Sequence, residues 1–180
     1  MLLLVLLLSF RFSYSQYKVE PPEGYTLEIG NMVYMLEELK GRITQMVQDM
    51  GTEQIDYLID EDANSIGALI LHLASTEAYY QIESLENRSF NKEEEEKWML
   101  GAGLGIASRE KIKGKPITHY LDIWDEVRSK TLSGLKQKDD KWFAETPDGE
   151  VSHHWAWYHV MEHQAVHMGQ ISHIKKRIPK

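Results

Sequence analysis

The first regular pattern in the chain is a stripe of apolar positions between residues 27 and 50, spaced alternately four and three residues apart. The stripe consists of Met32, Leu36, Leu39, Ile43, Met46 and Met50. This spacing places the apolar side chains on one face of an α-helix and predicts an amphipathic helix packed in a bundle. The sequence PPEG breaks the chain before this helix, and Gly51 stands where a C-terminal capping glycine would follow it.

Three further segments have the composition and spacing of helices. The second helix should begin near Asn64 or Ser65, both good N-caps, and continue to about residue 85. The inner face of the third is expected to contain Tyr120, Ile123, Trp124, Val127, Thr131 and Leu135. The fourth should start after Ser152 and run to Ile178, where a proline stops it. No segment alternates as a strand would, so we expect an all-α fold.

About thirty residues, 86–116, separate the second and third helices. Connections between helices of a bundle are usually about 2–8 residues long, so this one can cross the length of the bundle. We therefore expect a four-helix bundle with a long crossover, in which the second and third helices run parallel. A single domain is expected over residues 27–180, with a lead-in segment at 16–26.

The charge balance is acidic, with 28 Asp and Glu residues against 20 Lys and Arg residues. The densest charge run is KEEEEK at residues 92–97. Such a surface repels phosphate backbones, so we expect no nucleic-acid partner. The sequence contains no cysteine, which excludes disulfides, thiolate metal ligands and a cysteine nucleophile.

Residues 1–15 differ from the rest of the chain, with an apolar run from Leu2 to Leu8 and then a polar stretch. Ser13 and Ser15 occupy the −3 and −1 positions of a signal-peptide cleavage site. The run is much shorter than the roughly 20 apolar residues that span a bilayer, so we expect no stable membrane anchor. The segment predicts export, to the periplasm or the exterior. No Lys or Arg precedes the run, and if the start codon is misassigned the protein is cytoplasmic.

Near the C-terminus, His159, His163 and His167 follow one another at four-residue intervals. Side chains four residues apart lie on one helix face, so His163 and His167 can converge on one metal ion. The residue after His163 is Gln164 and not the glutamate of the zinc-protease motif, which argues against that chemistry. Taken alone, the pair could equally lie on a solvated helix face.

His72 interrupts the most apolar part of the second helix, in GALILHLAS. A buried imidazole costs free energy unless its ring nitrogens have partners, which a metal ion or a neighbouring helix could provide. Together, His72, His163 and His167 suggest a site of three neutral nitrogens with open coordination positions. Such a site could bind water, lower its pKa and generate hydroxide near neutral pH.

The other candidates have weaker support. Because a helix face drifts by about 40° over four residues, His159 is expected to support the site indirectly or to pack beside it. Gln170, three residues after His167, can reach the same side of the helix and could bond a ligand, contact a neighbouring chain or simply pack. The remaining histidines are expected at the surface or at helix caps. These are His119, His153, His154 and His173.

No carboxylate is assigned as a general base, and the catalytic residue stays unidentified. Glu77 lies five residues after His72, about 140° round the helix, and could be exposed. Four aromatic side chains could line a pocket or belong to the core. They are Tyr79, Tyr80, Trp155 and Trp157.

The sequences HVMEHQAVHMGQI and SIGALILHLASTEAYY resemble the DinB-like (YfiT-like) metalloenzyme superfamily. The resemblance covers about residues 27–179 and is most specific at His163, His167, Gly169 and Gln170. It implies a four-helix bundle, often dimeric, in which His72 joins the two helix-four histidines in binding a divalent metal. Three histidines accept several transition metals, and zinc or nickel is expected.

Members of this superfamily include metal-dependent hydrolases, S-transferases that use low-molecular-weight thiols, and a thiol-dependent isomerase. The residue after the second histidine is commonly Arg in the superfamily and is Met168 here, which weakens any contact to an anionic substrate at that position. Since thiols are scarce outside the cytoplasm, the predicted export favours a hydrolase that acts on a small molecule through metal-bound water. A thiol-dependent transferase or isomerase and a non-catalytic metal-binding domain are the alternatives.

Overall fold

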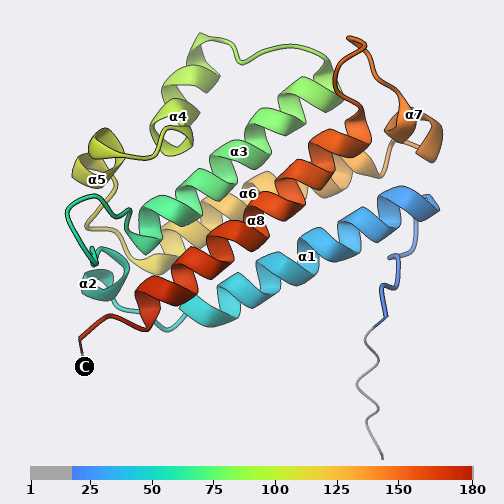
Figure 1. The fold of residues 1–180 in the computed structure, drawn as a ribbon. Coiled ribbons are helices and arrows are strands. Elements are labelled where there is room, and N and C mark those ends of the chain that lie inside the picture. The colour runs from blue at the N-terminus through green and yellow to red at the C-terminus, as the bar shows by residue number, and fades with distance from the viewer. Residues whose placement is uncertain (1–17, 180) are drawn as a thin grey trace, which may run out of the picture.

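The computed structural model describes residues 18–179, which contain helices and no strand. Four long helices form a bundle (Figure 1), namely α1 (Leu27–Val47), α3 (Ile66–Glu86), α6 (Ile117–Leu135) and α8 (His153–Lys175). Helix α3 packs against both α6 and α8, and α1 packs against α8. The predicted all-α bundle is confirmed.

The connection between α3 and α6 contains two shorter helices, α4 (Lys92–Ala102) and α5 (Ile106–Lys111). Helix α4 packs along α3, and the connection returns to the end of the bundle where α3 began (Figure 1). Helices α3 and α6 therefore run in the same direction, as the crossover predicts, and α1 and α8 run in the opposite one (Figure 1). The acidic run forms the start of α4, where negative charge is favourable to a helix N-terminus.

Two predicted helix ends are wrong by one turn. Helix α1 ends at Val47 instead of Met50, and Gly51 has φ −75°, so it is no left-handed capping glycine. Gly51 is instead the N-cap of α2 (Thr52–Ile55), a short helix that turns the chain toward α3. Helix α8 ends at Lys175 instead of Ile178. Apolar periodicity continues past these ends because Met50 and Ile178 still pack on the core from non-helical backbone.

Of the two N-caps expected for the second helix, Asn64 and Ser65, the structure uses Ser65, and the expected start after Ser152 is confirmed. The Ser65 hydroxyl accepts a hydrogen bond from the Ala68 N–H at 3.2 Å, and the Ser152 hydroxyl accepts one from the Trp155 N–H at 3.1 Å. Each bond satisfies a backbone donor that the first helical turn leaves unpaired. These two caps set where α3 and α8 begin, and therefore where the histidines of both helices lie. Before α8, the short helix α7 (Asp140–Ala144) packs against α1 and α8.

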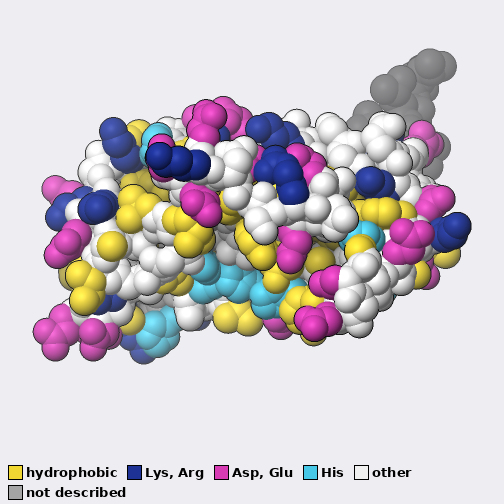
Figure 2. All heavy atoms as spheres, turned by 90° about the horizontal axis from the view of Figure 1, so that it is seen from above, with side chains coloured by type: hydrophobic (Ala, Val, Ile, Leu, Met, Phe, Trp, Pro, Cys, Tyr) yellow, Lys and Arg dark blue, Asp and Glu magenta, His cyan; other side chains and the backbone are white. Residues whose placement is uncertain are grey.

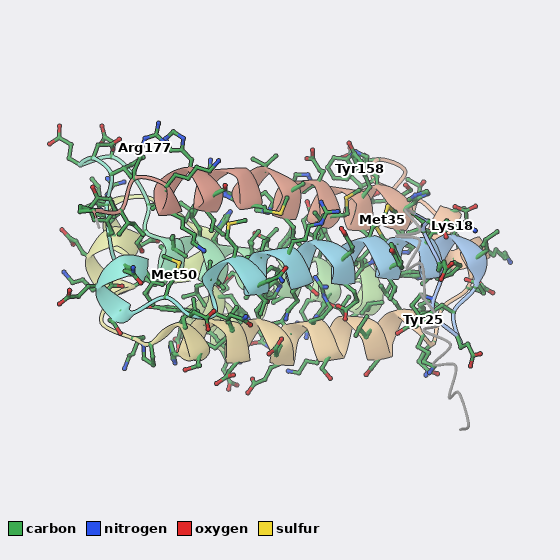
Figure 3. All side chains as sticks on the ribbon, turned by 90° about the horizontal axis from the view of Figure 1, so that it is seen from below. Lys18, Tyr25, Met35, Met50, Tyr158 and Arg177 are labelled. Atoms are coloured by element: carbon green, nitrogen blue, oxygen red, sulfur yellow. The ribbon has the colours of Figure 1, made fainter. Side chains whose placement is uncertain are left out.

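The apolar interior consists of two clusters at opposite ends of the bundle. The larger cluster includes Ile43, Val47, Leu69, Ile70, Leu73, Trp124 and Ile171. The smaller one includes Ile29, Leu36, Leu135, Phe143, Trp157 and Val160. Figure 3 shows Met50, of the larger cluster, near one end and Met35 and Tyr25, which pack on the smaller one, near the other.

Polar side chains from all four bundle helices meet where the two clusters adjoin, and we call them the polar layer. Its members are Glu37, Glu77, Gln81, Arg128, Thr131 and Gln164. The fully buried Glu77 accepts bonds from Arg128 Nε at 2.7 Å, from Trp124 Nε1 at 2.9 Å and from the Thr131 hydroxyl at 2.6 Å. Glu77, whose burial the sequence analysis left undecided, is thus an interior residue.

Among the described residues, no helix has both the length and the apolar composition needed to cross a membrane. The predicted signal peptide, residues 1–15, lies outside the described residues. The lead-in before α1 is anchored by Tyr25, whose hydroxyl donates to the Leu132 carbonyl at 3.1 Å.

Candidate metal centre

Three imidazoles from α3 and α8 converge on one point. His72 Nε2 lies 3.1 Å from His163 Nε2, which lies 2.9 Å from His167 Nε2. The ligand atoms of all three lie within 4.8 Å of one another. The structure therefore brings together the three histidines that the sequence predicts as metal ligands, with their Nε2 atoms facing inward.

The opposite nitrogens of two of these rings face acceptors. His72 Nδ1 lies 3.0 Å from the Gly101 carbonyl, and His167 Nδ1 lies 2.8 Å from Gln170 Oε1. A carbonyl oxygen only accepts, so each Nδ1 carries the proton and donates it, and each Nε2 presents a lone pair. Two inward lone pairs need a proton or a cation between them. This donor set fits a divalent metal, since outer carbonyl partners fix metal-binding histidines in this tautomer.

The cluster is held in its neutral state. Burial lowers the pKa of His163 to about 3, and the neighbouring histidines, His167 first, add to the effect. Burial also lowers the pKa of His72 and of His167, although hydrogen bonds from these rings to Gly101 and Gln170 oppose it. Neutral imidazole is the form that binds a metal, so the cluster is ready to do so near pH 7.

The carbonyl that meets His72 comes from a glycine in α4. A Cβ on Gly101 would lie only 2.9 Å from Leu71 Cγ and 3.1 Å from the Leu71 carbonyl, so any side chain would push α4 away from α3. The close approach of the two helices thus depends on this glycine. Sequence reasoning missed Gly101, because nothing in the local sequence indicates which backbone carbonyl will meet a side chain 29 residues earlier.

His159 lies beside the cluster without joining it. Its ring centroid is 5.7 Å from that of His163 at 28°, and it stacks on Trp155 at 5.2 Å with the rings nearly parallel at 5°. Its Nδ1 lies 3.0 Å from Glu162 Oε1, and Tyr80 meets the ring edge-on at 5.6 Å. The structure thus places His159 against a ligand candidate, in a row of aromatic rings.

The aromatic side chains that could line a pocket divide into two kinds. Trp157 is fully buried in the smaller apolar cluster and belongs to the core. Trp155, which stacks on His159, is 48% exposed, and Tyr79, which packs on Tyr80 and Phe90, is 40% exposed, so both contribute to the surface. His153, expected at the surface or at a helix cap, is the first residue of α8 but is buried, with its ring stacked on Trp142 at 4.1 Å.

The cluster lies at the surface of the bundle. His72 and His163 are only half-buried, whereas His167 is buried. Figure 2, which views the bundle from above, shows a band of histidine side chains near the middle of this face. Hydrophobic side chains flank the band. An ion bound by the three nitrogens would therefore have the remaining side open to small molecules.

Comparison with protein families gives one match over most of the chain. The family model described as Mycothiol-S-transferase matches residues 31–179. Among solved structures, the crystal structure of a conserved protein of locus from Enterococcus faecalis has a TM-score of 0.64 and 16% sequence identity, covering 81% of this chain and 93% of that one. At that identity the likeness concerns the fold. The comparison with curated proteins finds no match.

Proposed function

Because this chain belongs to the mycothiol-S-transferase family, part of the DinB/YfiT-like superfamily, we propose that it is a metal-dependent S-transferase. It would join a low-molecular-weight thiol such as mycothiol to an electrophilic small molecule. The observation that carries the proposal is the set of three inward-facing Nε2 atoms with an open side, in a chain that matches this family. A transferase needs room for two small molecules beside the ion, and that side lies at the surface.

His72, His163 and His167 would hold the divalent ion. When bound, the ion supplies positive charge that lowers the pKa of a thiol next to it, so that the reactive thiolate is present near neutral pH. The Gly101 carbonyl and Gln170 keep two of the rings in the required tautomer. The chain itself contains no cysteine, so the reacting sulfur must come from the co-substrate.

The reaction is a balanced substitution or addition. A sulfur–carbon bond forms between the thiolate and the electrophilic carbon, and the thiol proton is released to solvent. In a substitution the leaving group departs with its electron pair, and in an addition the carbon that gains the electron pair takes up a proton. The row formed by Trp155, His159 and Tyr80 offers aromatic surface near the cluster for the electrophile.

The hydrolase favoured by the sequence analysis would use the same three histidines, and its only separate support is the predicted export. The family match favours the transferase, so the hydrolase becomes the alternative outcome of the same assay. A non-catalytic metal-binding domain is the third outcome. Zinc or nickel is the expected metal, and elemental analysis identifies it.

The test combines metal content and turnover in the full-length protein, purified without a histidine tag. We expect about one equivalent of a divalent transition metal in the wild type and its loss in the alanine variants of His72, His163 and His167. Thiol transfer from mycothiol to electrophilic acceptors should fall at least about 100-fold in the same variants. His119→Ala, which changes an exposed histidine, is the matched control and should keep both metal and activity.

Each other outcome has a definite meaning. Metal-dependent cleavage of esters or amides without thiol transfer would establish the hydrolase. A bound metal that raises the unfolding temperature, with no turnover on either panel, would establish a structural ion. A wild-type protein that takes up no zinc or nickel on reconstitution would overturn the metal site altogether.

Two further proposals concern the protein in the cell. Export stays a prediction, and an exported transferase would have little access to a thiol that is found in the cytoplasm. Cell fractionation with N-terminal sequencing of the mature protein tests whether the protein is exported. A homodimer also stays a prediction, which light scattering during size-exclusion chromatography tests.

A further inference from the structure

His163 differs from the other two metal-ligand candidates in what holds its ring. His72 Nδ1 and His167 Nδ1 each face an oxygen acceptor, at 3.0 and 2.8 Å. Within residues 18–179, both hydrogen bonds of the His163 ring involve Nε2. The torsion that turns an imidazole about its Cβ–Cγ bond is broad, so a ring that is not fixed through its outer nitrogen needs another contact to set its plane.

His159 covers one face of the His163 ring. The two ring centroids lie 5.7 Å apart and the ring planes differ by 28°, which is an offset stack. His72 and His167 instead meet the His163 ring edge-on, at 65° and 89°. These two rings belong to the ligand set, whereas His159 contacts His163 from outside it.

His159 is itself held by three neighbours. Trp155 stacks on it at 5.2 Å with the ring planes only 5° apart, and Tyr80 of α3 meets its edge at 5.6 Å. Its Nδ1 donates to Glu162 Oε1 at 3.0 Å, since a carboxylate only accepts. Because Trp155, His159 and His163 follow one another at four-residue intervals, their rings lie in sequence along α8. A ring restrained in this way can restrain the ring that it covers.

The position of His159 does not suit direct binding of the ion. The ligand atoms that lie within 4.8 Å of one another belong to His72, His163 and His167. The outer nitrogen of His159 is engaged by Glu162, and the helix face turns by about 40° between His159 and His163. The contribution of His159 to a metal centre is therefore the orientation of its neighbour.

We propose that His159, held by Trp155 and Glu162, is the positioning residue that fixes the His163 ring in the metal centre. The inference rests on the metal centre of the proposed function, and it adds how the third imidazole is oriented. Hydrogen bonds set two of the three rings, and an aromatic stack sets the third. A stack fixes the plane of a ring through its flat face, so position 159 requires a flat ring and not a particular nitrogen.

Substitutions of His159 separate this role from ligation and from simple packing. His159→Ala removes the stack and should weaken zinc binding about tenfold, as the loss of other outer partners of metal ligands does. His159→Phe keeps a flat ring against His163 and should stay within about threefold of the wild type. Competition with a chromophoric chelator measures the affinity of the full-length protein. The absorption spectrum of cobalt-loaded protein reports coordination geometry, and it should change in His159→Ala and not in His159→Phe.

Trp155→Leu tests the same role without changing a histidine. It removes the ring that supports His159 and should weaken zinc binding about threefold. Tyr158→Leu changes another exposed aromatic residue of α8, and this matched control should leave the affinity and the cobalt spectrum unchanged. Circular dichroism shows whether each variant is folded, and Trp155→Leu supplies the test if His159→Ala does not fold.

The possible results distinguish the positioning role from the function on which it rests. Wild-type affinity in a folded His159→Ala protein would overturn the positioning role. An equal loss of affinity in His159→Ala and His159→Phe would also overturn it, because the imidazole itself would then be required. A wild-type protein that binds neither zinc nor cobalt would overturn the metal centre and the positioning role with it. The expected affinities without any thiol transfer would overturn the transferase and leave the positioning role in place.

Discussion

The protonation of single imidazoles decides what the cluster can do. The Gly101 carbonyl and Gln170 Oε1 each accept a proton from Nδ1, and this leaves the Nε2 atoms of His72 and His167 free to bind a cation. The first contact uses the backbone carbonyl of Gly101, so no substitution removes the acceptor, and any side chain at this position would instead separate α4 from α3. The second uses a side chain, so it can be tested directly.

Gln170→Ala should weaken metal affinity about 10–100-fold, because the His167 ring loses the partner that fixes its tautomer and orientation. Competition with a chromophoric chelator measures the affinity. Gln170→Glu should retain most of it, since a carboxylate accepts the same proton. Gln48→Ala, at the exposed C-cap of α1, is the matched control. Equal affinity in wild type and Gln170→Ala would show that the contact does not support the metal.

At the scale of the elements, α3 is the helix on which the fold depends most. It packs on α4, α6 and α8, and it carries both His72 and Glu77. Glu77 is fully buried, yet its pKa is lowered: burial alone would raise it, but the charge and hydrogen bonds of Arg128, with bonds from Thr131 and Trp124, outweigh burial. The carboxylate is therefore ionised and joins α3 to α6 by an interior ion pair.

Glu77→Leu should lower the free energy of unfolding by about 3–5 kcal/mol, because Arg128 is left buried without its main partner. Combining it with Arg128→Met should recover much of that loss, since both charges are then removed. Urea unfolding of the three proteins measures both effects. Glu38→Gln, which breaks an exposed pair with Arg42, should change stability by less than about 1 kcal/mol. A Glu77→Leu protein as stable as the wild type would contradict the interior ion pair.

The elements that periodicity predicted are those with one apolar face. The four bundle helices follow from spacing such as that of Leu36 and Ile43 and from the caps at Ser65 and Ser152, all of which are local signals. The crossover followed from its length. The short helices α2, α5 and α7 were not predicted, because none is long enough to show a periodic face. Helix α4 was missed because it begins with the acidic run and buries only Trp98 and Gly101, which form no apolar stripe.

The candidate site was predicted in part for the same reason. His163 and His167 lie on one helix turn, so spacing makes their convergence possible, the apolar surroundings of His72 in the sequence add the third candidate, and the resemblance supports all three. The pairing of Glu77 with Arg128, and the approach of Gly101 to His72, join residues 51 and 29 positions apart. Such contacts depend on how whole helices are docked, and the spacing within a single helix contains no information about them.

For the molecule as a whole, burial of several histidines links stability to pH. The pKa values of His72, His153, His163 and His167 are all lowered, chiefly by burial. Unfolded histidine takes up a proton near pH 6.5, while the folded groups do not until the pH is lower. The unfolded chain therefore binds more protons below about pH 6.5, and folding stability must fall as the pH falls.

Metal-free protein should consequently lose stability between pH 7.5 and about pH 5.5, a window that lies above the titration of ordinary carboxylates. Urea unfolding at several pH values measures the loss. His163→Gln should show a smaller decline, since His163 has a pKa lowered to about 3, whereas His119→Gln, at the surface, should follow the wild type. A wild-type stability that is flat across this window would contradict the neutral, buried state of the cluster.

The polar layer also restricts how the four helices can be aligned. Each of α1, α3, α6 and α8 contributes at least one of its members, and the apolar clusters lie on either side. A helix that slid by one turn along its neighbours would carry a charged or amide group into hydrocarbon. The observed register keeps the Glu77 carboxylate paired with Arg128 and within reach of Gln164 Nε2. Gln164 stands next to His163 in α8, so this register also brings the histidines of α8 level with His72.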